Sequence, residues 1–135
     1  MKMKNEYKRI HGRLLLITGI LHLIVTLLPG IFGKQILDFA SHGFFNINKG
    51  LLAFPLFGGT LDNESFSAFW FFYMVPIMLM LGHLIDNLEQ INGFVPRQTA
   101  IHFLIVSLIG AYMVPISGMT FFLVPQAVYM LVRSQ

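Results

Sequence analysis

The ionisable residues that lie deepest in the apolar segments of this chain are histidines, so any chemistry is first sought there. In a helix, His22 would lie about 13 Å beyond Arg13. Thr18 and Thr26 are each four residues from His22, so all three share one helical face. Burying such a side chain among apolar ones is unfavourable unless it is partnered. His22 is therefore either a hydrogen-bonding residue that holds helices together or a functional residue, and the sequence leaves both open.

Four more polar residues fall toward one common end of the later apolar segments. They are His83, His102, Gln126 and Tyr129. If the helical faces that carry them converge, they enclose a small polar cavity together with His22, in the half of the membrane nearest the cytoplasm. These five residues are the candidate site predicted from the sequence.

Several kinds of chemistry fit a histidine cluster. Two facing imidazoles can ligate a metal or clasp the iron of a haem. The chain shows no paired histidine motif and no carboxylate at a ligand spacing, so no metal site is expected. A histidine beside a carboxylate can relay protons or bind a quinone head group. His83 with Asp86 is the local pair that could serve acid–base catalysis of a lipid, although such spacings are also common for structural reasons.

The overall composition indicates a membrane protein. Of the 135 residues, 56% are hydrophobic and 11% are charged, whereas soluble domains carry about 25% charged residues. There are no cysteines, which excludes disulfides, thiolate metal sites and cysteine nucleophiles. The net charge is +3, but the basic residues gather at the ends of apolar segments, which favours anionic lipid head groups over nucleic acid.

The apolar residues form four segments that could cross a bilayer. The longest uncharged run, Gln98–Val132, would be roughly 50 Å long as one helix, more than the ~30 Å of a hydrocarbon core. Pro115 and Gly118 interrupt it, which predicts a hairpin. We predict an uncleaved first span and three more, approximately at residues 14–33, 66–85, 99–114 and 118–132.

The segments between the spans are more polar. Residues 34–50 show helical spacing of apolar side chains, which fits a short helix in the membrane interface or a loop. Residues 51–59 are apolar but too short to span, and could re-enter the membrane. Residues 86–97 are predicted to form a polar loop with turn signals at Asn92-Gly93 and Pro96. Pro76 is expected to kink the second span.

The basic residues predict the orientation. With four spans, seven basic residues flank one side and two, Lys34 and Lys49, flank the other. The first group consists of Lys2, Lys4, Lys8, Arg9, Arg13, Arg97 and Arg133. The positive-inside rule then places both termini and the 86–97 loop in the cytoplasm.

The closing hairpin carries a resemblance. Its stretch MVPISGMTFFLVPQAVYML, with the aromatic entry FWFF and the ending LIDNLEQINGFVPR, resembles an uncharacterised family of small four-span bacterial membrane proteins, a domain of unknown function with a DoxX-like general layout. The matching positions are Glu89, Pro96-Arg97, Pro115-Ile116-Ser117-Gly118 and Pro125. The resemblance implies a fold and a location in the bacterial inner membrane, and it brings no reaction.

We therefore expect one integral membrane domain over residues 1–135, an all-α antiparallel four-helix transmembrane bundle with a short interfacial helix between the first two spans. The expected function is binding of a small or amphipathic molecule, or service as an accessory subunit, and the sequence favours a protein that is not an enzyme. The alternative is a proton- or redox-linked protein. No cofactor is expected, with haem or quinone as the alternative. The expected partners are the lipid bilayer, other membrane subunits or further copies of the chain.

Overall fold

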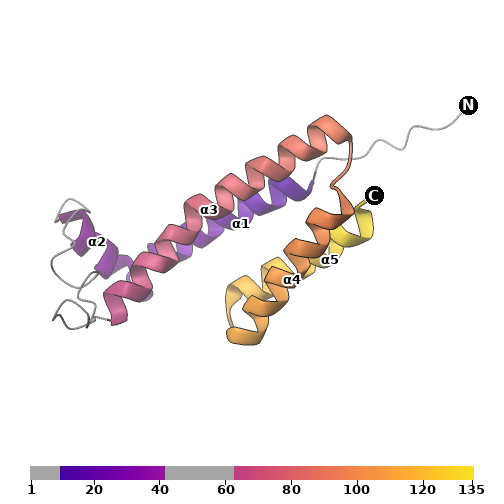
Figure 1. Cartoon of the computed structure of the whole chain (residues 1–135). Helices are drawn as coiled ribbons and strands as arrows, with labels where there is room; N and C mark the ends of the chain where they lie inside the picture. The colour runs from indigo at the N-terminus through magenta and orange to yellow at the C-terminus, as the bar shows by residue number, and fades with distance from the viewer. Residues whose placement is uncertain (1–9, 42–62) are drawn as a thin grey trace, which may run out of the picture. The chain divides into compact units, whose positions relative to one another are not determined.

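The structure, a computed structural model, describes residues 10–41 and 63–135, and this part of the chain contains five helices and no strand (Figure 1). The all-helical prediction is confirmed. The helices are α1 (His11–Thr26), α2 (Gly33–Ser41), α3 (Asn63–Asn92), α4 (Arg97–Met113) and α5 (Gly118–Arg133).

The described residues group into two compact units. The first unit holds residues 10–18 and 78–135, and the second holds residues 19–41 and 63–77. The boundary between the units falls within both α1 and α3. Whether the chain forms one integral membrane domain, as the composition predicts, stays a prediction.

In the first unit, α1 and α3 run antiparallel and alternate small and large residues. Gly12 lies against the backbone of Asp86, so that a Cβ at residue 12 would lie 2.6 Å from the Asp86 Cα. One turn further on, Leu16 lies against Gly82, where a Cβ would lie 2.9 Å from the Leu16 Cγ. Each glycine therefore leaves room for a residue of the other helix, which is how helices approach closely in membrane proteins.

The closing hairpin is confirmed. Helix α4 ends at Met113, and α5 begins at Gly118 and packs against α4 (Figure 1). The Ser117 side chain caps α5 by accepting a hydrogen bond from the Thr120 backbone N–H at 3.2 Å. The apolar core of the first unit joins all four of its helices, at Leu15, Ile85, Val95, Ala100, Phe103, Ala127 and Met130.

Two predicted boundaries are wrong. The first apolar segment does not stay helical to Gly33, because α1 ends at Thr26 and a turn containing Pro29 and Gly30 follows. Residues 86–92 are not a loop: they form the last turns of α3, which ends only at Asn92. Gly93, with φ of 76°, then takes a left-handed conformation that favours glycine, so the turn signal is correctly placed while the helix before it is longer than expected.

Part of the segment predicted to form a short helix after the first span can be compared with the structure. Residues 34–41 of that segment are helical and belong to α2, and its location in the membrane interface stays a prediction. The rest of that segment and the apolar stretch 51–59 lie outside the described residues. Helix α3 continues through Pro76.

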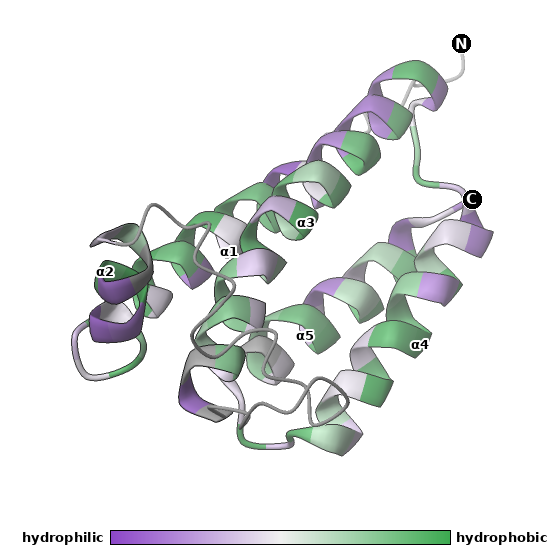
Figure 2. Ribbon diagram, turned by 60° about the vertical axis from the view of Figure 1, so that its left-hand side comes forward, coloured by the Kyte–Doolittle hydropathy of each residue, from purple (hydrophilic) through white to green (hydrophobic). Residues whose placement is uncertain are grey.

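Apolar residues make up much of these helices (Figure 2), and many of the large apolar side chains are exposed. Within the described residues, one helix is long and apolar enough to cross a membrane, namely the stretch Phe66–Asn92 of α3. The apolar helices His11–Thr26 and Thr120–Arg133 are shorter. This finding agrees with a membrane location by length and composition.

Candidate functional site

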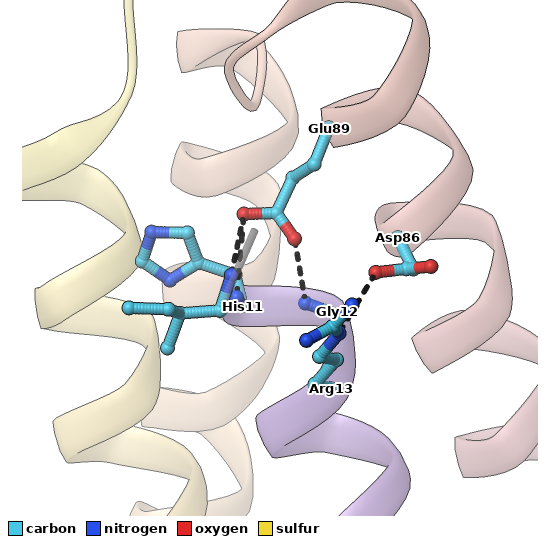
Figure 3. Close-up of polar contacts among 6 residues, drawn as sticks. His11, Gly12, Arg13, Asp86 and Glu89 are labelled. Carbon is cyan, nitrogen blue, oxygen red and sulfur yellow. Dashed lines mark hydrogen bonds and ion pairs between the residues drawn. The ribbon is translucent and has the colours of Figure 1, made fainter. Parts of the chain in front are cut away.

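A buried carboxylate from the end of α3 lies at the beginning of α1 (Figure 3). Glu89 is 1% exposed. Its Oε1 accepts the backbone N–H groups of Ile10 and His11, each at 3.3 Å, and its Oε2 accepts that of Gly12 at 3.0 Å. We refer to Glu89, Asp86, His11, Gly12 and Arg13 as the Glu89 site.

The sequence before α1 explains why another helix supplies this carboxylate. The first N–H groups of a helix have no partner within the helix. Serine, threonine, aspartate or asparagine usually accepts them, but Arg9 and Ile10 precede α1 and neither side chain can accept a hydrogen bond. The first turn of α1 also has no acidic residue. Glu89 satisfies these donors and places a negative charge at the positive end of the helix dipole.

The close approach of α1 to α3 depends on Gly12. The backbone of Asp86 occupies the space that a side chain at residue 12 would need. Because Glu89 is one turn beyond Asp86 on α3, the same approach brings its carboxylate within reach of the N–H groups of α1 (Figure 3).

Asp86 is the second carboxylate of the Glu89 site. Its Oδ1 lies 3.9 Å from the Nε of Arg13, whose side chain is 63% exposed. That Oδ1 is buried and has no hydrogen-bond partner in the described part of the chain. The ion pair is therefore long and partly hydrated on the arginine side, and it contributes little to stability.

His11 connects the Glu89 site to α5. Its side chain is buried, and its ring lies 5.0 Å from the ring of Tyr129, centroid to centroid. The Arg133 guanidinium lies over the Tyr129 ring, 5.8 Å from the ring centroid. Burial lowers the pKa of His11 below its ordinary value; the Glu89 carboxylate opposes the shift and the Arg133 charge adds to it.

A second buried polar contact joins α1 to α5 further along the first unit. The Gln126 side-chain amide donates a short hydrogen bond to the Thr18 hydroxyl, which in turn donates to the Leu14 carbonyl at 2.9 Å. The Gln126 Oε1 is buried without a hydrogen-bond partner among the described residues. Thr18 is 4% exposed, so this polar chain lies inside the helix packing.

His22 is hydrogen-bonded within the second unit. Its Nε2 lies 2.9 Å from the backbone carbonyl of Phe71 on α3, and because a carbonyl only accepts, Nε2 carries the proton. The two rings also contact, with centroids 4.7 Å apart. Thr26, fully buried, donates to the His22 carbonyl at 2.7 Å. The polar face predicted for α1 is thus directed toward protein, and His22 makes a helix–helix contact.

The predicted candidate residues have different surroundings. Gln126 contacts Thr18, and Tyr129 contacts His11, both in the first unit. His83 on α3 and His102 on α4 are exposed. No described hydrogen bond or ring contact joins either of them to the other candidates, and His22 belongs to the second unit. The cavity stays a prediction.

Sequence reasoning missed His11 and the structural part played by Glu89. The absence of a capping residue before α1 was the available signal, because a buried helix start must find acceptors elsewhere. The sequence did not indicate which carboxylate would supply them, since Glu89 and Gly12 are 77 residues apart.

The chemistry of the Glu89 site is that of a structural clamp. Both carboxylate oxygens of Glu89 accept main-chain N–H groups. Among the residues that the structure describes, no group of three or more histidines, cysteines or carboxylates could hold a metal ion. The Glu89 carboxylate and the first N–H groups of α1 satisfy one another, and the His11 ring packs on Tyr129 of α5.

Comparisons with known proteins place the chain in a family. No curated protein and no solved structure matches it. A family model described as a family of unknown function, DUF6463, matches residues 6–135. The match spans nearly the whole chain and includes Glu89, Gly12 and the closing hairpin. The chain therefore belongs to this family of unknown function, DUF6463.

Proposed function

We propose that this chain is a multi-pass protein of the bacterial cytoplasmic membrane that binds an amphipathic molecule and catalyses no reaction. Its four apolar segments cross the bilayer as an antiparallel bundle. Both termini and the connection between α3 and α4 face the cytoplasm, where the positive-inside rule places the basic flanks.

The observation that carries this proposal is the distribution of polarity. Within residues 10–41 and 63–135, the buried polar side chains are those of His11, Thr18, His22, Thr26, Glu89 and Ser107. Large apolar side chains are exposed on all five described helices, among them Ile24 at 54% and Val106 at 66%. Water-soluble monomers rarely expose large apolar side chains over so much of their surface, whereas helices in a bilayer direct them toward lipid.

The lengths of the helices are compatible with four crossings, although within the described residues only α3 is long and apolar enough to span an undistorted bilayer. Helix α3 has 30 residues, about 45 Å, which is ample for one crossing. Helices α1, α4 and α5 have 16 or 17 residues, about 25 Å each. The hydrocarbon core is about 30 Å thick, and local thinning of the bilayer accommodates a difference of a few ångströms.

The partners of the buried polar groups support a structural part for these side chains rather than a catalytic one. The Nε2–H of His22 donates to a backbone carbonyl, and the amide of Gln126 donates to Thr18. A catalytic acid or base needs an open approach to its substrate, and these groups are instead engaged between helices.

The topology can be tested directly, because the chain has no native cysteine. We expect full-length protein in salt-washed membranes, and labelling of Ser117→Cys but not Gln98→Cys by a membrane-impermeant maleimide in intact cells. Labelling of Gln98→Cys alone contradicts the orientation, and labelling of neither contradicts a hairpin that reaches the far side. Recovery of the protein in the aqueous fraction without detergent contradicts the membrane location itself.

A second test separates binding from redox chemistry. We expect the purified protein to be colourless, and His22→Ala to lower its thermal stability in detergent while His83→Ala and His102→Ala, at exposed positions, do not. A Soret absorption band, or quinone extracted in stoichiometric amount from wild type but not from His22→Ala, contradicts the proposal and favours the proton- or redox-linked alternative.

A further inference from the structure

Two arginines lie at one end of the α4–α5 hairpin. Arg97 is the first residue of α4 and Arg133 is the last of α5. Main-chain hydrogen bonds hold the two ends together: Arg97 N–H donates to the Gln135 carbonyl at 3.0 Å, and Gln135 N–H donates to the Val95 carbonyl at 3.3 Å. We call Arg97 and Arg133 the arginine pair.

The arginine pair is available for an anion. Within the described part of the chain, neither guanidinium forms an ion pair, whereas Asp86 is paired with Arg13. The other carboxylate of this unit, Glu89, is buried and accepts three main-chain N–H groups. Both arginines are exposed, so both positive charges at this end of the hairpin are accessible.

Each arginine also lies at one end of a row of exposed apolar side chains along its helix, and we call each row an apolar stripe. Below Arg97, spacings of four, four, three and four lead along α4 to Ile101 (40% exposed), Ile105 (49%), Leu108 (50%) and Tyr112 (89%). Along α5, Arg133 stacks on Tyr129, and the same face continues to Pro125 and Phe122, which is 50% exposed. From Arg97 to Leu108 the stripe is roughly 16 Å long, about the depth of one leaflet.

We propose that the arginine pair and these two stripes bind an anionic phospholipid, whose phosphate contacts the guanidinium groups and whose acyl chains lie along α4 and α5. Guanidinium groups bind phosphate oxygens in a bidentate manner, and a basic site beside exposed apolar helices matches a lipid head and its tails together. This inference rests on the proposed membrane location and names the class of amphipathic molecule that is bound.

The test uses full-length protein in a neutral detergent with an equimolar mixture of phosphatidylglycerol and phosphatidylcholine of the same acyl chains. Native mass spectrometry counts the lipids that stay bound. Since each arginine near a lipid surface contributes about a fivefold preference for an anionic head group, wild type should retain phosphatidylglycerol at least about fivefold over phosphatidylcholine. Arg97→Gln/Arg133→Gln should lose this preference, and Arg97→Lys/Arg133→Lys should keep most of it.

The matched control is Lys34→Gln, which removes one exposed positive charge from α2 and should keep the wild-type preference. Equal retention of the two lipids by wild type overturns the proposal, as does a loss in Lys34→Gln equal to that in the double glutamine variant. If the double glutamine variant loses helix content, the test uses wild type at different salt concentrations instead. Its preference for phosphatidylglycerol over phosphatidylcholine should fall between 0.05 and 0.5 M salt, because salt screens the charges. A preference that salt does not change overturns the proposal.

Two further measurements complete the test. The first distinguishes binding of the whole lipid from binding of its head group alone. The second distinguishes failure of this inference from failure of the proposed function. A tenfold excess of soluble glycerol phosphate should not displace the lipid, because the apolar stripes hold its acyl chains; displacement overturns the part played by the stripes. A protein that fractionates with membranes but shows no preference for the anionic lipid contradicts this inference alone. A protein recovered in the aqueous fraction contradicts the proposed function.

Discussion

The Oε2 of Glu89 accepts the backbone N–H of Gly12 at 3.0 Å, across 77 residues of sequence. This contact allows α1 to begin at His11 although no residue before it can cap the helix. It also requires that residue 12 have no side chain, because the α3 backbone at Asp86 lies where a Cβ would stand. The start of α1 and the end of α3 therefore depend on each other.

Replacing Glu89 tests the clamp. In Glu89→Gln one oxygen becomes an NH2 group, so at least one main-chain N–H of α1 faces a donor instead of an acceptor. Leaving a buried donor unsatisfied destabilises a protein by about 1–3 kcal/mol. We expect a lower midpoint of thermal unfolding, followed by circular dichroism in detergent. Gln90→Ala, at the exposed neighbouring position, should stay within about 0.5 kcal/mol of wild type; equal effects of the two changes argue against the clamp.

A methyl group at residue 12 tests the approach of the two helices. In Gly12→Ala, the Cβ would overlap main-chain atoms of Asp86, which cannot move away without shifting α3. Overpacking of this kind destabilises by about 1–3 kcal/mol or more. The control is Gly110→Ala on α4, where a Cβ meets no atom within 4 Å; there alanine should stabilise the helix by up to about 1 kcal/mol. Unfolding midpoints that fall equally for both would contradict the close approach.

The lowered pKa of His11 predicts that the folded protein loses stability in mild acid. Burial holds the folded-state pKa of His11 below its ordinary value of 6.5, so the unfolded chain takes up a proton that the folded chain resists. The stability associated with neutral His11 is complete above about pH 6.5, and it is lost as the pH falls through the lowered folded-state pKa.

The measurement for His11 is the unfolding midpoint of wild type and of His11→Gln at several pH values between 8 and 5. The variant should show a shallower decline below pH 6.5, because its side chain does not titrate. If the two declines have the same slope, the acid sensitivity arises elsewhere in the chain.

The contact between Thr18 and Gln126 predicts an asymmetric pair of variants. Thr18→Val leaves the buried amide of Gln126 without its acceptor, which should destabilise by about 1–3 kcal/mol. Gln126→Leu removes that donor together with the buried Oε1, which has no partner in the described structure, and should change stability by less than about 1 kcal/mol. The double variant should resemble Gln126→Leu alone, so that a double-mutant cycle reports coupling between the residues. Additive effects would contradict the contact.

Some features of this protein follow from local sequence. The apolar content and the sparse charges predict helices in a lipid environment, because so few polar side chains cannot cover a soluble globule. Pro115 and Gly118 divide the last apolar run, and the hairpin between α4 and α5 lies where these residues predict it. The polar face of Thr18, His22 and Thr26 is likewise buried, since helical spacing alone places them together.

Other features depend on the tertiary structure. The turns of α3 beyond Ile85 look like a loop in sequence because they are polar, yet they are helical and carry Glu89 to the start of α1. His11 becomes a buried residue only because α3 and α5 pack around it, and His83 is exposed although its apolar segment suggests otherwise. The amino-acid sequence by itself determined which stretches are apolar and where the closing hairpin turns, because these are properties of neighbouring residues. Only the packing of α1 against α3 and α5 decided which polar groups meet, because the partners are far apart in the chain and no local pattern pairs them.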